Sequence, residues 1–289
     1  MSKHIVGFSG GIDSQACARW VLNRYRAEDV ILLNSDAGGN EHPLTTEFVE
    51  EYSRTVHHVV RLQPILADMW KTPLWAENHY QMSSEEPLTF ELMAKIKGRF
   101  PSKTAQFCTE KLKINPMVRW IESNMGDEEF TRYSGVRREE SGDRADQPEV
   151  GWDTLLDCEY RCPLVEWLKP QCFESVKGEP INYLYSLGFS RVGCAPCVNN
   201  GKEDIASWAR RAPEMIDKVR GWEQSTNRTF FAPCVPGIKP RIDGRGKLSI
   251  HNWIDEVVEW SKTDYGGYQF NILKELDRPS CESKYGLCE

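Results

Sequence analysis

The most constraining feature of this sequence is the stretch SGGIDS, residues 9–14, which stands between an apolar run and a helical pattern. Two consecutive glycines remove side-chain bulk and permit positive φ, so the backbone is able to fold tightly around a bound group. The hydroxyls of Ser9 and Ser14, together with the N–H groups that open the next helix, then direct donors into one small concavity. These residues predict an anion site at a strand-to-helix turn, and phosphate is its usual occupant.

Two common phosphate-binding motifs are absent from this turn. A Walker loop requires G-x-x-x-x-G-K-[ST], with a lysine that reaches the terminal phosphates, and SGGIDS has no such lysine. A dinucleotide fingerprint requires G-x-G-x-x-G, which the turn also lacks. The sequence therefore argues against a P-loop NTPase and against a dinucleotide-binding fold of the usual kind.

Strand and helix signals alternate through the first third of the chain. Apolar runs predict strands at 4–9, 30–36 and 57–63, and helical spacing predicts helices at 13–25 and 45–56. Such alternation indicates an α/β fold, a Rossmann-like parallel sheet with helices on both faces. Because ligands of these sheets lie beyond the carboxyl ends of the strands, SGGIDS and the turn SDAGGNEHP are expected on the same rim.

The rest of the chain is less regular. We expect helices and loops at 70–109, a strand at 131–138 that leads into a charged loop, and a loop-rich stretch after Pro163. Helical patterns predict one helix at 204–224 and another at 248–263. The predicted domains are an α/β domain over residues 1–200, which contains the anion-binding turn, and a helical C-terminal extension over 201–289, which ends in a cysteine-containing tail and packs on the first domain.

Charge and composition narrow the class of protein. The net charge of −7 argues against a protein that coats nucleic acid without specificity, since such binding is mostly phosphate neutralisation. The chain has no apolar stretch near the roughly 20 residues that span a bilayer, and the N-terminus lacks a signal-peptide pattern, so we expect a cytoplasmic protein with no membrane partner. Ten cysteines in a reducing compartment point to metal, cluster or redox chemistry.

SGGIDS and four further motifs in order carry a family resemblance over about residues 5–200. SGGIDS resembles the PP-loop of the adenine-nucleotide α-hydrolase superfamily, and NSDAGGNEHPLTTEF, YSGVRREESGDRA and NYLYSLGFSRVGCAPCVNN resemble elements of its phosphoadenosine phosphosulfate (PAPS) reductase family. CTEKLKINPM matches a further element in the variant form of DNA phosphorothioation enzymes. The resemblance implies the PP-loop fold and an adenine nucleotide, ATP or PAPS, bound with Mg²⁺.

The resemblance also implies roles for individual residues. Asp13 is expected to position Mg²⁺ or the phosphates, and Arg137 and Lys111 to neutralise charge that develops on the pyrophosphate. Planar guanidinium groups suit bidentate phosphate or sulfate contacts, and Glu139 and Glu140 are placed to orient them. The expected nucleotide-binding residues are Ser9, Gly10, Gly11, Asp13, Ser14, Asp36, Gly38, Arg138 and Arg144.

The cysteines leave two metal sites open. Cys194 and Cys197 form a C-x-x-C turn that is able to bind one metal centre, and a tetrahedral Zn²⁺ or a [4Fe–4S] cluster requires about four ligands. One alternative adds Cys281 and Cys288 around zinc. The other follows cluster-bearing relatives and combines Cys108, Cys194, Cys197 and a C-terminal cysteine. The remaining cysteines are interpreted as structural: Cys17, Cys158, Cys162, Cys172 and Cys234.

Two departures from the family leave three functions open. The tandem Cys-Cys of cluster-bearing members is Phe107-Cys108 here, and the C-terminal E-C-G-[LI]-H is replaced by YGLCE. The first hypothesis is an ATP pyrophosphatase that forms AMP and pyrophosphate to activate a nucleic-acid or protein acceptor for sulfur transfer. The second is a PAPS or adenosine phosphosulfate reductase that uses a thioredoxin-like reductant, with Cys288 as nucleophile. The third is a catalytically silent nucleotide-binding accessory protein of a mobile-element or defence locus.

Overall fold

The computed structural model describes residues 2–69, 82–140, 142–237, 239, 241–242, 248–249 and 251–264. Its strands are β1 (Lys3–Gly7), β2 (Val30–Ser35), β3 (Val59–Leu62), β4 (Phe130–Tyr133), β5 (Val150–Asp153), β6 (Cys158–Arg161), β7 (Arg241–Ile242) and β8 (Leu248–Ser249). Its helices are α1 (Ile12–Leu22), α2 (Pro43–Thr55), α4 (Phe90–Lys97), α5 (Phe107–Thr109), α6 (Asn115–Met125), α7 (Lys169–Ser175), α8 (Lys202–Arg211), α9 (Pro213–Thr226) and α10 (Ile254–Ser261). In the described ranges no helix is both long and apolar enough to cross a membrane.

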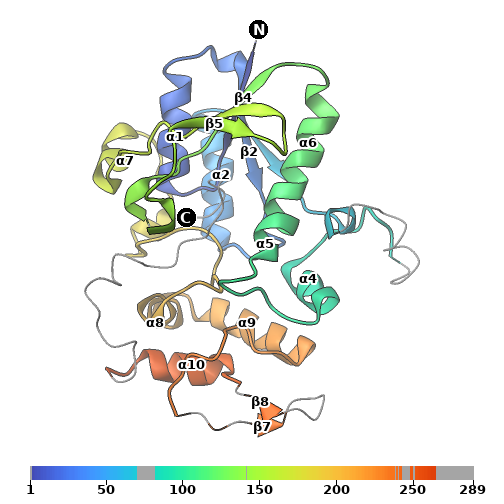
Figure 1. Cartoon of the computed structure of the whole chain (residues 1–289). Coiled ribbons are helices and arrows are strands. Elements are labelled where there is room, and N and C mark those ends of the chain that lie inside the picture. Colours follow the sequence, from blue (N-terminus) through green and yellow to red (C-terminus); the bar gives the residue numbers. More distant parts are fainter. Residues whose placement is uncertain are drawn as a thin grey trace.

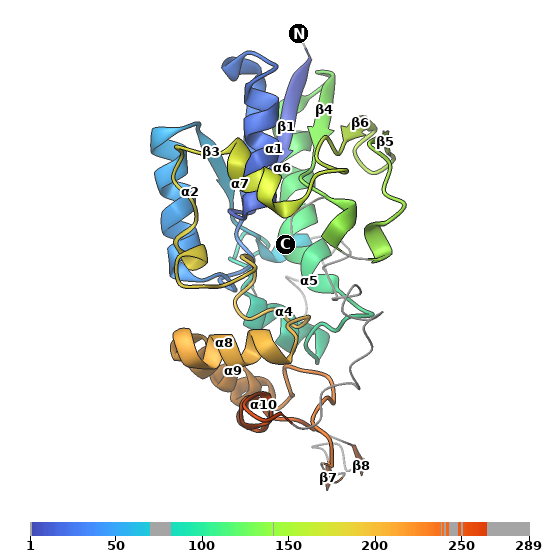
Figure 2. The same ribbon diagram turned by 90° about the vertical axis from the view of Figure 1, so that its left-hand side faces the viewer.

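The central element is a six-stranded sheet of order β3-β2-β1-β4-β6-β5. Strands β3, β2, β1, β4 and β6 are parallel to one another, and the edge strand β5 runs antiparallel to β6. Helices α1, α2 and α7 lie on one face of the sheet and α6 on the other (Figures 1 and 2). The predicted Rossmann-like α/β fold is confirmed.

Alternation along β1 explains why both faces are covered. Val6 belongs to the apolar cluster under α1 and α2, whereas its neighbour Ile5 belongs to the cluster under α6. Successive side chains of a strand point to opposite faces, so an apolar run buries both. With helices on both faces, a ligand approaches the sheet at the ends of its strands.

The C-terminal helices form a second layer beyond the carboxyl ends of the strands. Helices α8, α9 and α10 lie beside α4, below the sheet in Figure 1. Their apolar cluster includes Trp208, Trp222 and Val257, and it also takes in Phe90 of α4 and Leu184 from before the predicted boundary at residue 200. The extension therefore shares a core with the part of the chain before residue 200.

Several predicted elements differ from the structure. The helix predicted at 204–224 is wrong as one helix, because Pro213 has no N–H for the preceding turn and starts α9 after a break at Ala212. The helix predicted at 248–263 begins only at Ile254, since Leu248 and Ser249 form β8. The hairpin of β5 and β6 and helix α7 were not predicted. Residues 70–81 and the tail from residue 265 lie outside the described residues.

Candidate functional site

The candidate site lies where the order of the strands reverses. Strands β1, β2 and β3 progress to one side of β1, while β4 pairs with its other side. The PP-loop, residues 9–14, follows β1, and Ser134–Arg137 follow β4. A crevice at the carboxyl ends of strands forms at such a reversal, which is the general ligand site of open α/β sheets.

The serine hydroxyls of the PP-loop form hydrogen bonds within the loop. The Ser9 hydroxyl lies 3.1 Å from the Ser14 hydroxyl, and the Ser14 hydroxyl donates to the Gly11 carbonyl at 2.9 Å. Gly10 has φ of +82°, and a Cβ there lies 3.0 Å from Thr45 Cγ2 on α2. Gly10 thus lets the loop turn tightly while it packs on α2.

Asp13 and Arg137 form a buried ion pair between the loop and β4. Arg137 Nε lies 2.9 Å from Asp13 Oδ2, and the side chains are nearly enclosed, with exposed fractions of 4% for Arg137 and 5% for Asp13. A second ion pair joins Arg137 to Glu139. Burial lowers the pKa of Arg137, but attraction to Asp13 and then Glu139 outweighs it and holds that pKa above its usual value. The guanidinium is therefore a fixed positive charge at the PP-loop.

Gly135 allows this close approach. A Cβ at residue 135 lies 2.5 Å from the carbonyl oxygen of Asp13 and 3.0 Å from the Ser14 nitrogen, both backbone atoms. No side chain larger than hydrogen fits at this distance unless the backbone shifts. The loop after β4 and the start of α1 therefore touch backbone to backbone, which brings Arg137 onto Asp13.

The other predicted cations have carboxylate partners elsewhere. Arg138 pairs with Glu166 and donates from Nε to the Gln147 carbonyl at 3.1 Å. Arg144 forms an ion pair with Glu140. Lys111 Nζ lies 2.7 Å from Glu110 in a π-helical turn, η3 (Glu110–Ile114). Of the three predicted arginines, Arg137 is the one that the structure brings onto the PP-loop, and the phosphate-binding roles of Arg138 and Arg144 stay predictions.

The loop after β2 reaches the same rim and contacts the C-terminal extension. Asp36 Oδ1 accepts from the Gly39 N–H at 2.8 Å, and Gly38 adopts φ of +66° against the backbone of Phe90. Lys218 of α9 donates to the Gly39 carbonyl. Burial lowers the pKa of Lys218, against the attraction of Asp36 and Glu41. This contact places a cation of the extension beside the predicted nucleotide rim.

Two residues of the segment 182–185 contact the PP-loop, and no role was predicted for either. The Tyr185 hydroxyl accepts from the Ile12 N–H at 2.9 Å, at the N-terminus of α1. Asn182 Nδ2 donates to the Gly10 carbonyl at 3.1 Å and to Thr45 Oγ1 at 3.3 Å. The only sequence signal was the family segment NYLYSLG itself. These contacts hold a distant loop against the PP-loop.

A cavity of about 830 Å³ opens beside the loop. Arg137 and Tyr185, which both contact the PP-loop, belong to its wall, and so do Lys169, Arg191, Lys202 and Glu203. Ligand cavities in proteins commonly measure about 300–1,000 Å³, so the volume suits a nucleotide. Its mixed positive and negative lining suits a ligand that carries several polar groups.

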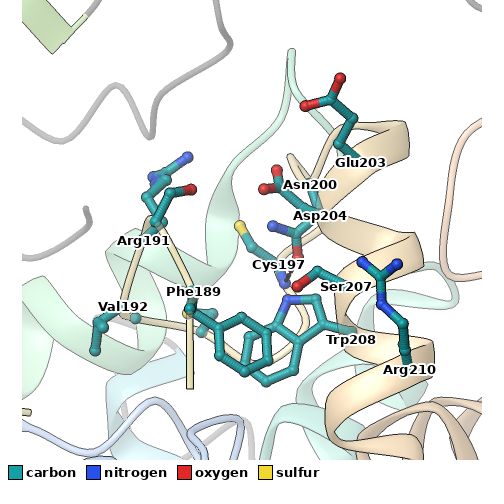
Figure 3. A pocket seen from close by; sticks show the side chains of 14 residues that line it. Phe189, Arg191, Val192, Cys197, Asn200, Glu203, Asp204, Ser207, Trp208 and Arg210 are labelled. Carbon is teal, nitrogen blue, oxygen red and sulfur yellow. Dashed lines mark hydrogen bonds between the residues drawn. The ribbon is translucent and has the colours of Figure 1, made fainter. Parts of the chain in front are cut away.

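The C-x-x-C turn separates two smaller pockets. Cys194 and Cys197 line an outer pocket of about 210 Å³ with Trp208 and Arg191, and an inner one of about 20 Å³ with Cys108. Figure 3 shows the Cys197 side chain between the loop that carries Arg191 and helix α8. The Asn199 N–H donates to Cys197 Sγ at 3.5 Å. The structure thus brings three of the five predicted metal ligands to one inner pocket.

These cysteines do not by themselves complete the predicted metal site. Within the described ranges, no three His, Cys, Asp or Glu side chains are placed to hold a metal ion. Cys281 and Cys288, which supply the remaining ligands in both alternatives, lie outside the described residues. Three thiols are fewer than the roughly four ligands of a zinc or cluster site, so the metal site stays a prediction.

Comparisons with known proteins show which sequences this chain is similar to. Residues 3–200 match the family model of the phosphoadenosine phosphosulfate reductase domain. The chain is 28% identical to an "Uncharacterized 37.8 kDa protein in gpa 5'region" of Escherichia phage 186, over 99% of this chain and 96% of that one. It is 28% identical to the adenosine 5'-phosphosulfate reductase of Allochromatium vinosum over 48% of this chain and 52% of that enzyme.

A solved PAPS reductase from Candida auris, in complex with phosphate, covers 67% of this chain and 82% of its own, at 14% identity and a TM-score of 0.45. The family model spans well over half of the chain, including the PP-loop, the loop after β4 and the C-x-x-C turn. The chain therefore belongs to the phosphoadenosine phosphosulfate reductase domain family.

Proposed function

We propose that this chain binds ATP at the PP-loop and cleaves it to AMP and pyrophosphate, which activates an acceptor for sulfur transfer. The observation that carries the proposal is the meeting of Arg137 with the PP-loop at the reversal of strand order, 2.9 Å from Asp13. A fixed buried cation stabilises charge that develops on the departing pyrophosphate without reorganising during the reaction. The cavity of about 830 Å³ beside it has room for the nucleotide.

The polar groups of the PP-loop and Arg137 have distinct roles in this proposal. The backbone N–H groups at the start of α1 and the hydroxyls of Ser9 and Ser14 bind the phosphates. Arg137 neutralises their charge, and Asp13 orients Arg137. Since Asp13 Oδ2 is taken by a guanidinium, its environment suits an ion pair better than a metal ligand. Asp13 therefore acts as a positioning residue for Arg137.

The proposal is tested by product analysis. Purified protein is incubated with Mg²⁺ and ATP, with candidate acceptors present or absent, and AMP and pyrophosphate are quantified by chromatography. The proposal requires AMP and pyrophosphate in equal amounts. ATP binding without AMP under all conditions overturns it and supports the accessory-protein alternative.

A second function has its own support. The similarity to the adenosine 5'-phosphosulfate reductase of Allochromatium vinosum covers 48% of this chain, and Cys194 and Cys197 line a pocket that shares Phe189 and Arg191 with the large cavity. A reductase releases sulfite from PAPS or adenosine phosphosulfate when a thioredoxin-like reductant is supplied. Sulfite release together with absent AMP formation from ATP favours this second function.

Tyr185→Phe is expected to tighten ATP binding by about 2- to 10-fold, the equivalent of one net hydrogen bond. The Tyr185 hydroxyl accepts the Ile12 N–H at 2.9 Å, and a phosphate oxygen at the start of α1 competes for that donor. Removal of the hydroxyl removes the competitor. Titration calorimetry with a non-hydrolysable ATP analogue measures the change.

Tyr183→Phe is the matched control for this experiment. The Tyr183 hydroxyl bonds Glu51 at the surface, so its loss is expected to leave the dissociation constant unchanged. Weaker nucleotide binding by Tyr185→Phe contradicts the competition and indicates that the hydroxyl contacts the nucleotide directly.

A further inference from the structure

The segment that joins α4 to α5 carries unbalanced positive charge. From residue 92 to residue 109 the chain has four basic residues and no acidic one, in a protein of net charge −7. Lys95 is balanced by Glu91, 2.6 Å away. Lys97, Arg99 and Lys103 are exposed, and the described part of the chain offers them no carboxylate partner. We call these three residues and Phe107 the basic patch.

An aromatic ring fixes two of these cations without neutralising them. Lys97 Nζ lies 5.7 Å and the Arg99 guanidinium 5.5 Å from the centre of the Phe107 ring. A cation over an aromatic face is attracted to the ring, which carries no net charge to offset its own. The two charges are therefore ordered and remain available to an anion.

The C-terminal extension adds a further cation to the patch. Arg228, which follows α9, donates from Nε to the Gly98 carbonyl at 3.0 Å, between Lys97 and Arg99 in the sequence. It also donates to the carbonyl of Asn227, at 2.9 Å, and among the residues that the structure describes no carboxylate balances it. The hydrogen bond from Arg228 to Gly98 thus adds a positive charge of the extension to the basic patch.

The patch borders the inner cysteine pocket. Gln106 and Cys108, on either side of Phe107, line that pocket together with Cys194 and Cys197. A ligand that lies along Lys97, Arg99 and Phe107 therefore runs next to three thiols. The basic patch therefore adjoins the candidate site, which an ordinary basic surface patch does not.

We propose that the basic patch docks a single-stranded nucleic acid beside the cysteine pocket. Clustered cations around an aromatic ring are the pattern that binds single strands, since phosphates contact the cations and a base contacts the ring. Phe107 is only partly buried, so part of its ring is available to a base. The overall charge of −7 restricts a polyanion to this local region. The identification of the strand as the sulfur acceptor rests on the proposed function, whereas its docking does not.

The test is fluorescence anisotropy with a labelled single strand of about 20 nucleotides at about 50 mM and 200 mM salt. The variant Lys97→Gln/Arg99→Gln/Lys103→Gln is expected to bind at least about 10-fold more weakly at low salt. Each phosphate contact to a single strand contributes about 0.7 to the slope of log affinity against log salt, so three lost contacts reduce that slope by about 2.

A control of equal charge is available. Arg54→Gln/Lys177→Gln/Lys262→Gln removes three exposed cations from α2, the end of α7 and the end of α10, away from the patch. It is expected to retain most of the affinity. An equal loss in the control overturns the proposal, because the loss then reflects net charge alone.

Two further measurements complete the test. Phe107→Leu keeps an apolar side chain but removes the aromatic face, and it is expected to weaken single-strand binding several-fold. Equal affinity for a duplex of the same length or for heparin overturns the assignment of a single strand. ATP titration of the patch variant is expected to match wild type, so a failure of docking is distinguishable from a failure of the PP-loop.

Discussion

Gly135→Ala is expected to abolish nucleotide binding and to lower the free energy of unfolding by about 1–3 kcal/mol or more, the cost of overpacking a close contact. A Cβ at this position lies 2.5 Å from the Asp13 carbonyl oxygen and 2.6 Å from its carbon. Both are backbone atoms at the start of α1, so no side-chain rotation relieves the clash. The methyl group has to separate the loop after β4 from the PP-loop, which also separates Arg137 from Asp13.

Gly221→Ala is the matched control. Gly221 lies inside α9, and a Cβ there has no heavy atom within 4 Å. Because glycine costs roughly 0.5–1 kcal/mol relative to alanine inside a helix, this variant is expected to be at least as stable as wild type and to bind ATP normally. Urea unfolding and ATP titration give both quantities. Wild-type affinity in Gly135→Ala shows that the contact does not shape the nucleotide site.

The positions and the parallel direction of the first strands of the sheet were predictable from local patterns. Apolar runs such as VILLNS, buried on both faces, indicate parallel strands, and SGGIDS marks the turn where one of them ends. The break between α8 and α9 was predictable too, since Pro213 interrupts an otherwise continuous helical pattern.

Other elements depend on contacts between distant segments. In β5 the apolar Val150 and Trp152 are exposed while Asp153 is buried, which reverses the usual pattern, and the strand exists because it pairs with β6 at the sheet edge. The helix predicted at 248–263 starts late because Leu248 pairs with Ile242. Periodicity within one window contains no information about such partners.

The same limit applies to the candidate site. The turn that the serines and glycines of the PP-loop form between β1 and α1 was predictable because it depends on neighbours in sequence. Tyr185 contacts Ile12 across 173 positions, and only the fold brings them together. The pairing of Arg137 with Asp13 depends on Gly135, which resembles an ordinary turn residue in the sequence. Sequence motifs thus predict which residues lie at the carboxyl ends of the strands, whereas the side chains that contact them depend on long-range packing.

Arg137→Met is expected to lower the free energy of unfolding by about 3–5 kcal/mol, because it leaves the Asp13 carboxylate buried without its cation. Asp13→Asn is expected to cost less, since Arg137 then keeps its second partner Glu139, whose side chain is 46% exposed. The asymmetry follows from this second partner and not from burial, as the side chains of Arg137 and Asp13 are 4% and 5% exposed. Urea unfolding of the two single variants measures it.

The double variant Asp13→Asn/Arg137→Met separates stability from function. With both charges gone, no uncompensated ion is buried, so the double variant is expected to be more stable than Arg137→Met alone. It is nevertheless expected to form no AMP from ATP, because the guanidinium that neutralises the pyrophosphate is missing. Additive losses of stability contradict the ion pair, whereas AMP formation by the folded double variant contradicts the role of Arg137. Because the two readouts move in opposite directions, instability alone cannot account for the expected pattern.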